Sequence, residues 1–363
     1  MDSPPPEFLD PSLPPPRVSI RDVAREVGVS IMTVSLSLRN NPKISDATRR
    51  RVQAAAKKLG YRPDPEIARL MTRLHHLRQT SDSPPMAIVD LSPMRLPPGT
   101  EDYCEMVRRG AVARAESLGY IATCFHQLDY EGDVQRLLKV LRYRGIRGIL
   151  LLPPLRPVEL PAGLDWAPFS VIVASYAITP LQFHRVVPHQ FVDMCRLIKL
   201  LEGRGFRRIG AVFEEHYEER IQFHFTAAIK LLDYGDNILR VKQQDSLSRE
   251  ELVDWIKRKQ PDALVCPFAL KLGDALPPES PTFRRPVIIS LRALRGTTLS
   301  YWDERPEEIG SDAALLLAGM IQHNETGVPD SPRTSLVHGV FHDATMPPEK
   351  AKPAKKKKPA KKK

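Results

Sequence analysis

The sequence predicts a small helical head followed by a larger α/β body built from two parallel sheets. In residues 18–59 the apolar side chains fall at helical spacing in three short bursts. Past residue 85, short aliphatic runs alternate with helical stretches over roughly 260 residues, as in parallel strands joined by crossover helices. One sheet rarely uses so much chain, so we expect two doubly wound lobes.

The three bursts of the head have helix start and stop signals. They begin after Ser19, Ser30 and Ser45, whose hydroxyls suit the N-cap position, and Gly28 and Gly60 suit the ends of the first and third helices. The segment from Ile20 to Asn40, IRDVAREVGVSIMTVSLSLRN, reads as two short helices joined by a Gly-Val-Ser turn. This is the pattern of a helix-turn-helix.

The second helix of such a pair is a protruding rod that fits the major groove of DNA. The hydroxyls of Ser30 and Thr33, with the free amides around them, are expected to meet phosphate. The competing interpretation is a three-helix bundle with a solvated basic face and no DNA contact.

The charge distribution favours the DNA-binding interpretation. The chain has a net charge of +11, and residues 17–80 hold 14 Lys and Arg against 5 Asp and Glu. Residues 345–363 hold nine Lys against Glu349 alone, which leaves the rest of the chain net acidic. Basic ends around an acidic middle indicate that the ends meet a polyanion, here double-stranded DNA.

The composition divides the chain further and predicts its surroundings. No run approaches the roughly 18 apolar residues of a membrane span, and the first residues are acidic and proline-rich, unlike a signal peptide. We therefore expect a cytoplasmic, nucleoid-associated protein with no membrane partner, whose four scattered cysteines are reduced core thiols. The expected parts are a disordered Pro-rich leader (1–16), the helix-turn-helix domain (17–63), a hinge helix and linker (64–83), the two-lobed core (84–346) and a disordered Lys-rich tail (347–363).

Motifs in the head match a known family in order and spacing. Residues 18–63 contain DVAREVGVS, TVS and ISDATRRRVQAAAKKLGYRP, and they resemble the DNA-binding head of the lactose-repressor (LacI/GalR) family. The resemblance implies a homodimeric transcription regulator, most simply a repressor, on a pseudo-palindromic operator. It also implies a periplasmic-binding-protein-like core, in which a small effector, most simply a carbohydrate, controls the affinity for DNA.

The resemblance places the base-reading side chains at Ile31, Met32 and Leu36 of the second helix. Leu36 is a departure, because the family usually has arginine there. Without a bidentate arginine–guanine contact, we expect reading through thymine methyl groups and DNA shape. The alternative is that Leu36 packs inward on the third helix. The further expected DNA contacts in the head are Ser19, Ser35 and Asn40.

Residues 64–77 resemble the family's hinge helix, which folds in the minor groove and inserts an apolar wedge between base pairs. Aligned on Ile67-Ala68-Arg69, the wedge is Met71; counted from Pro63, it is Leu70, and both remain candidates. Arg69 is an expected DNA contact. The alternative is an amphipathic linker helix without groove contact.

In the core, Arg220 matches the family's ligand-gripping arginine, with a surface ion pair to Glu218 or Glu219 as the alternative. Tyr176 and Trp302 are candidates for stacking on a sugar ring, although aromatic residues near strand ends more often pack in the core.

Two departures in the core argue against a plain monosaccharide effector. Glu304 falls where the family has a glutamine, and it is the fourth candidate effector contact. The family's aspartate at a Gly-Phe-Asp strand end is missing, and the chain reads Ile289-Ser290-Leu291-Arg292 instead.

Two other classes of function, an architectural DNA-binding protein and an enzyme, explain the sequence less well. A nucleoid-associated architectural protein without effector would explain the lysine tail but not the α/β body. An enzyme is not expected, because the sequence has no Gly-rich phosphate loop, no Gly-x-Ser-x-Gly and no His-Glu-x-x-His. No cofactor and no metal ion are expected.

Overall fold

The computed structural model describes residues 18–38, 43–61, 83–97, 102–180, 182–242, 248–292 and 298–344. The expected leader, hinge helix and Lys-rich tail lie outside the described residues, as do Asn40, Arg69, Leu70 and Met71. Within the described ranges, no helix combines the length and the apolar character needed to cross a membrane.

The head consists of three helices around a small apolar core. Val23, Val34 and Val52, one from each helix, are completely buried at its centre. The helix starts follow the predicted capping chemistry: the Oγ of Ser30 accepts a hydrogen bond from the Thr33 amide at 3.0 Å. The helices are α1 (Ile20–Val27), α2 (Ile31–Leu38) and α3 (Asp46–Leu59), and α1 and α3 end at Gly28 and Gly60 in the left-handed conformation.

The first lobe is built on a six-stranded, fully parallel sheet with the order β13-β7-β5-β3-β1-β2. Its strands are short and mostly buried on both faces, which explains their continuous aliphatic runs. They are β1 (Pro85–Asp90), β2 (Ile121–His126), β3 (Gly148–Leu151), β5 (Ser170–Val173), β7 (His184–Pro188) and β13 (Thr334–Val337), with a separate pair β4 (Val158–Glu159) and β6 (Ile178–Thr179).

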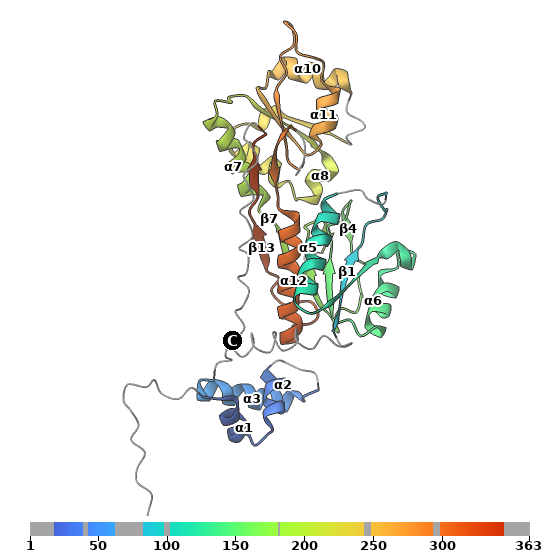
Figure 1. Ribbon diagram of the computed structural model, residues 1–363, viewed down its shortest axis with the longest axis vertical. Helices are drawn as coiled ribbons and strands as arrows, with labels where there is room; N and C mark the ends of the chain where they lie inside the picture. The colour runs from blue at the N-terminus through green and yellow to red at the C-terminus, as the bar shows by residue number, and fades with distance from the viewer. Residues whose placement is uncertain are drawn as a thin grey trace, which may run out of the picture.

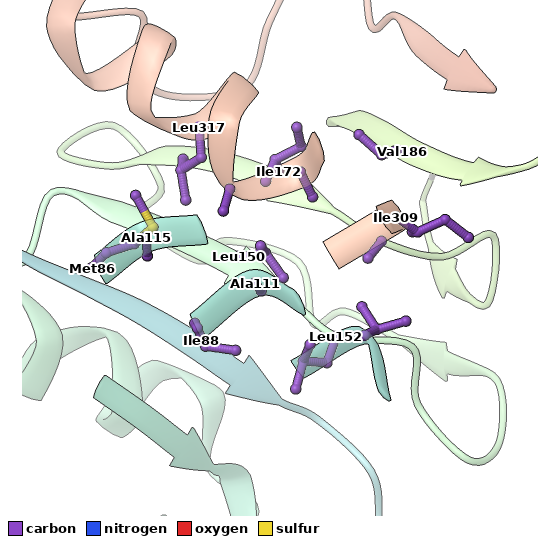
Figure 2. Close-up of a cluster of buried hydrophobic side chains, with 14 of the residues drawn as sticks. Met86, Ile88, Ala111, Ala115, Leu150, Leu152, Ile172, Val186, Ile309 and Leu317 are labelled. Carbon is purple, nitrogen blue, oxygen red and sulfur yellow. The ribbon is translucent and has the colours of Figure 1, made fainter. Parts of the chain in front are cut away.

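Two helices cover one face of this sheet and a third covers the other. α5 (Tyr103–Ser117) and α12 (Pro306–His323) lie side by side, and α6 (Val134–Tyr143) packs opposite them (Figure 1). Figure 2 shows the cluster on the α5–α12 face, where side chains such as Met86, Leu150 and Leu317 meet. The two helices approach closely because each has a glycine at the crossing, Gly110 in α5 and Gly310 in α12.

The second lobe repeats the architecture with the strand order β14-β12-β11-β10-β8-β9, in which only β14 is antiparallel to its neighbour. Its strands are β8 (Ile209–Glu214), β9 (Ile238–Val241), β10 (Ala263–Cys266), β11 (Val287–Ser290), β12 (Ser300–Asp303) and β14 (Val340–His342). Its helices are α7 (Gln190–Gly203), α8 (Glu215–Arg220) and α9 (His224–Leu231) toward one face, and α10 (Arg249–Lys259) and α11 (Ala269–Ala275) toward the other. Single 3₁₀ turns occupy Gln127–Tyr130 and Gly235–Asn237.

The chain crosses between the two lobes three times. It leaves the first lobe from β7 into α7, returns from β12 into α12, and crosses again from β13 to β14 (Figure 1). The first and the last connection touch: the buried carboxylate of Asp193 on α7 accepts a hydrogen bond of 2.6 Å from the amide of Gly339. The three connections together form the hinge between the lobes.

Candidate functional site

The second helix of the head presents an uncharged, partly apolar face to solvent. Ile31 is 45% exposed and Met32 is 70% exposed, unusually high values for large apolar side chains. Leu36 and Ser35 are half-exposed and stand one turn further along, at i+4 from Met32 and Ile31. Leu36 is partly buried and is not among the side chains that pack in the head core, whereas Leu38 is. The alternative that Leu36 packs inward on the third helix stays open beside its predicted role in base reading.

The polar residues predicted in the head sit at helix starts. The hydroxyls of Ser30 and Thr33 are 2.9 Å apart at the first turn of α2. The amide of exposed Ser19 donates to the carboxylate of Asp22 at 2.9 Å, and this contact helps to fix the start of α1. The structure thus brings Ser30, Thr33, Ile31 and Met32 together at one helix end, with Ser19 at the start of the neighbouring helix.

The body contains a pocket where the carboxyl ends of strands from both sheets meet. The first lobe contributes Tyr103, Pro153, Ser175, Tyr176 and Pro188, and the second contributes Tyr217, Arg220, Ile221, Arg292 and Glu304, with Gln190 at the crossover between them. Loops at this edge of a parallel sheet are the usual place for a ligand. Three of the four predicted effector contacts, Tyr176, Arg220 and Glu304, line the same pocket.

Arg220 is the strongest polar feature of the pocket. Its Nε is buried and has no hydrogen-bond partner among the described residues. Burial, with a smaller contribution from nearby Arg292, lowers the pKa of its guanidinium. The alternative of a surface ion pair is wrong: within the described part of the chain, neither Glu218 nor Glu219 pairs with it, and Glu218 is buried and accepts from the Thr226 amide at 3.0 Å.

Glu304 forms the floor of the pocket with a partner that joins the lobes. Its Oε1 accepts a hydrogen bond of 3.1 Å from Nε2 of Gln190. Burial raises the pKa of Glu304 to about 7, so at neutral pH this carboxyl is only partly ionised. The Oε1 of Gln190 is buried and has no partner among the described residues, which leaves an acceptor to be satisfied by a ligand or water.

The two predicted aromatic contacts behave differently. Tyr176 lies at the pocket, with the His224 ring edge-on at 5.1 Å and the Arg185 guanidinium carbon 5.8 Å from its ring centre. Trp302 does not reach the pocket: it is 4% exposed and packs in the core of the second lobe. Its prediction as an effector contact is wrong. The side chain of Trp302 points from β12 to the sheet face that α7 covers, and the guanidinium of Arg196 lies over its ring.

Among the pocket residues that were not predicted are Tyr103, Gln190, Tyr217 and Arg292. Arg292 lies two residues after the end of β11, and this position near a strand end was a usable signal. Tyr103, Gln190 and Tyr217 sit in the first turns of α5, α7 and α8, and only the packing of the lobes brings these helix starts together.

Thiol and metal chemistry have little support in the body. All four cysteines are free, and Cys104 and Cys266 are buried as predicted, whereas Cys124 is exposed, contrary to the prediction of a core thiol. Across the described ranges, no three His, Cys, Asp or Glu side chains gather as they would to hold a metal ion.

Comparison with known proteins decides the family of the head. Residues 19–64 match the family "Bacterial regulatory proteins, lacI family". The match covers the head of the chain, which is similar to the DNA-binding domain of these regulators. Over 202 residues the chain is 29% identical to the HTH-type transcriptional regulator GalS of Salmonella typhimurium, covering 55% of this chain and 54% of that protein. The chain thus matches about half the length of this curated relative.

Solved lacI-family structures have the same fold. The transcriptional regulator CelR in complex with cellobiose has a TM-score of 0.51 and 17% identity, covering 90% of this chain and 98% of CelR. The lac repressor dimer bound to operator and the anti-inducer ONPF has a TM-score of 0.50 and 13% identity, with the same coverage. At these identities the likeness shows the fold alone: a helix-turn-helix head on a two-lobed periplasmic-binding-protein-like core. The relatives are named as regulators and not as enzymes, as the sequence predicted.

Proposed function

We propose that this protein, whose head matches the lacI family, is a sequence-specific transcription regulator, most simply a repressor, that binds operator DNA as a homodimer in the cytoplasm. A small, sugar-like effector bound between the lobes controls the affinity for operator DNA. The observation that supports the proposal most directly is the pocket, which joins side chains of both lobes around Arg220. The buried Nε of Arg220 has no partner among the described residues, and the head of the same chain matches the lacI family.

DNA reading falls to the exposed face of α2. Ile31, Met32 and Leu36 offer apolar surface suited to thymine methyl groups, and none of them can make the bidentate contact to guanine that an arginine makes. The exposed Ser30 hydroxyl and the first amides of α2 suit a phosphate contact. Two such heads related by a two-fold axis would read a pseudo-palindrome. Hinge contacts from Arg69 and from Leu70 or Met71 remain predictions.

Effector control follows from the position of the pocket. A ligand that contacts Ser175 and Tyr176 on one side and Arg220 and Glu304 on the other stabilises one relative setting of the lobes. Three short connections join the lobes, so the lobes can change their relative orientation. The ligand can shift the equilibrium between these orientations. The architectural nucleoid interpretation gives this pocket no role, and the relatives do not favour it.

The test is selection of bound genomic fragments with the full chain, followed by titration of one selected fragment and of a scrambled fragment of equal composition. A sequence-specific regulator binds the selected fragment roughly 10³-fold or more tightly. Small molecules linked to the neighbouring genes are then added, and a true effector shifts the titration. Equal affinity for selected and scrambled DNA at every salt concentration would support the architectural alternative and overturn the proposal.

A further inference from the structure

We infer that the ligand of this pocket is an anion, a polyhydroxylated molecule bearing a carboxylate or a phosphate monoester that Arg220 and Arg292 hold together. The inference rests on the proposed effector function and names the chemical class of the effector.

The two arginines face one pocket from different elements. Arg220 ends α8, and Arg292 follows β11 at the exposed edge of the pocket. Within the described residues neither forms an ion pair; the Arg292 guanidinium carbon only lies 5.6 Å from the ring centre of Tyr217. Guanidinium groups match carboxylate and phosphate oxygens in a two-pronged geometry, so one anionic group entering the pocket would satisfy both.

A third cation stands behind the pocket wall. Arg185 is 3% exposed, donates from Nη1 to the carbonyl of Ser175 at 2.8 Å, and has a buried Nη2 without a partner among the described residues. Ser175 and Tyr176, which it supports, both line the pocket. Its charge adds to the positive potential where a ligand would bind.

The acids around the pocket neutralise this charge poorly. Glu304 is the acid in the lining, and Asp102 lies near Arg292 at the start of α5. Burial raises the pKa of both carboxyls. Asp193, at the hinge, is already engaged by the Gly339 amide and by Arg196 at 3.3 Å. Among the residues that line the pocket, two arginines, Arg220 and Arg292, therefore face one carboxyl, Glu304.

Other pocket groups suit hydroxyls on the body of the ligand. The buried Oε1 of Gln190 accepts and the buried hydroxyl of Tyr103 can donate, and neither has a partner among the described residues.

The experiment measures protection of the full chain against thermal unfolding by matched sets of ligands. Each set contains one neutral sugar, the acid with the same carbon skeleton and its phosphate monoester, for example glucose, glucuronate and glucose 6-phosphate; inorganic phosphate is added as a bare anion. We expect an anionic member to bind at least tenfold more tightly than its neutral counterpart. The sets distinguish a carboxylate ligand from a phosphate ligand.

The variants Arg292→Gln and Arg284→Gln form a matched pair. Both remove an exposed arginine of the second lobe, but Arg284 lies outside the pocket lining. We expect Arg292→Gln to lose tenfold or more of the affinity for the anion while Arg284→Gln binds like the parent. The inference is overturned if neutral sugars bind as tightly as their acids and phosphates, if no anion protects the chain, or if Arg292→Gln keeps the preference.

The inference and the proposed function can fail separately. Operator-specific DNA binding together with a neutral effector would support the proposed regulator function and overturn the inference that the ligand is an anion. Anion binding without any sequence-specific DNA binding would support the anionic ligand and overturn the proposed regulator function.

Discussion

Gln190 donates a hydrogen bond of 3.1 Å from its side-chain amide to Oε1 of Glu304, and this one contact links two of the three connections between the lobes. Gln190 begins α7, where the chain enters the second lobe, and Glu304 lies between β12 and α12, where it returns. Both side chains also line the pocket. A ligand that competes with this hydrogen bond for either side chain therefore acts directly on the connections between the lobes.

The titration of Glu304 predicts a pH dependence of stability. Its pKa is about 7 in the folded chain against 4.5 for the ordinary carboxyl, so between these pH values the folded state keeps a proton that the unfolded state has released. The free energy of unfolding should then fall as pH rises from about 4.5 to 7, by at most about 3 kcal/mol from this group. Urea unfolding of the ligand-free chain across this range measures the slope.

The slope can be assigned to Glu304 with a matched pair of variants. Glu304→Gln should flatten the slope between pH 4.5 and 7, because the amide does not titrate. Glu308→Gln, one turn into α12 and exposed beside Arg305, should leave it unchanged. An unaltered slope in Glu304→Gln would contradict the raised pKa.

The fold was predictable wherever hydrophobic patterning was strong. α6 and β10 show the helically spaced and the continuous apolar runs whose alternation predicted two parallel sheets. β7 and β12 lack such a run, because their sequences, HRVVP and SYWD, mix polar and charged residues into the strands. β13 lacks one because it is a largely exposed edge strand. The three passages of the chain between the lobes leave no local pattern in the sequence, so they could not be predicted from it.

The candidate site was predictable only where the family motif or a strand end marked it. Arg220 and Glu304 were found by position, and Tyr176 by its place after a strand. Trp302 shares those cues, yet the alternation of side chains along β12 sends it to the core. Gln190 and Tyr103 come from helix starts more than 80 residues apart, and only the assembled lobes show that they meet.

The apolar reading face of α2 predicts how Leu36 contributes to DNA binding. Leu36→Ala should weaken binding to a selected operator more than binding to random DNA, by about 1–3 kcal/mol from the lost burial of its apolar atoms against thymine methyl groups. Leu231→Ala, a 65% exposed leucine of the second lobe, serves as the control and should change neither affinity. Gel-shift titrations at one salt concentration measure both, and equal losses on the two DNAs would make Leu36 structural.

The lysines at 350–363 predict a separate, sequence-independent contribution. Deleting these residues removes nine lysines. Affinity for all DNA should fall and the salt dependence should flatten, since each phosphate contact contributes about −0.9 to the slope of log affinity against log salt. Operator preference should persist, because lysine, alanine and proline offer little to read a base edge. Titrations at several salt concentrations compare the full chain with one ending at Glu349; an unchanged slope would show that these lysines do not touch DNA.

The glycines at the crossing of α5 and α12 predict opposite effects for two substitutions in one helix. A Cβ on Gly310 would lie 1.9 Å from the carbonyl oxygen of Val107, and a Cβ on Gly110 would lie equally close to that of Glu307, so backbone meets backbone from both sides. Gly310→Ala must push the helices apart, at about 1–3 kcal/mol or more of stability. Gly319→Ala, in the same helix with no atom within 4 Å of the new Cβ, should stabilise by up to about 1 kcal/mol through helix propensity. Urea midpoints of the two variants give the comparison, and a Gly310→Ala chain as stable as the parent would mean that the two helices do not cross this closely.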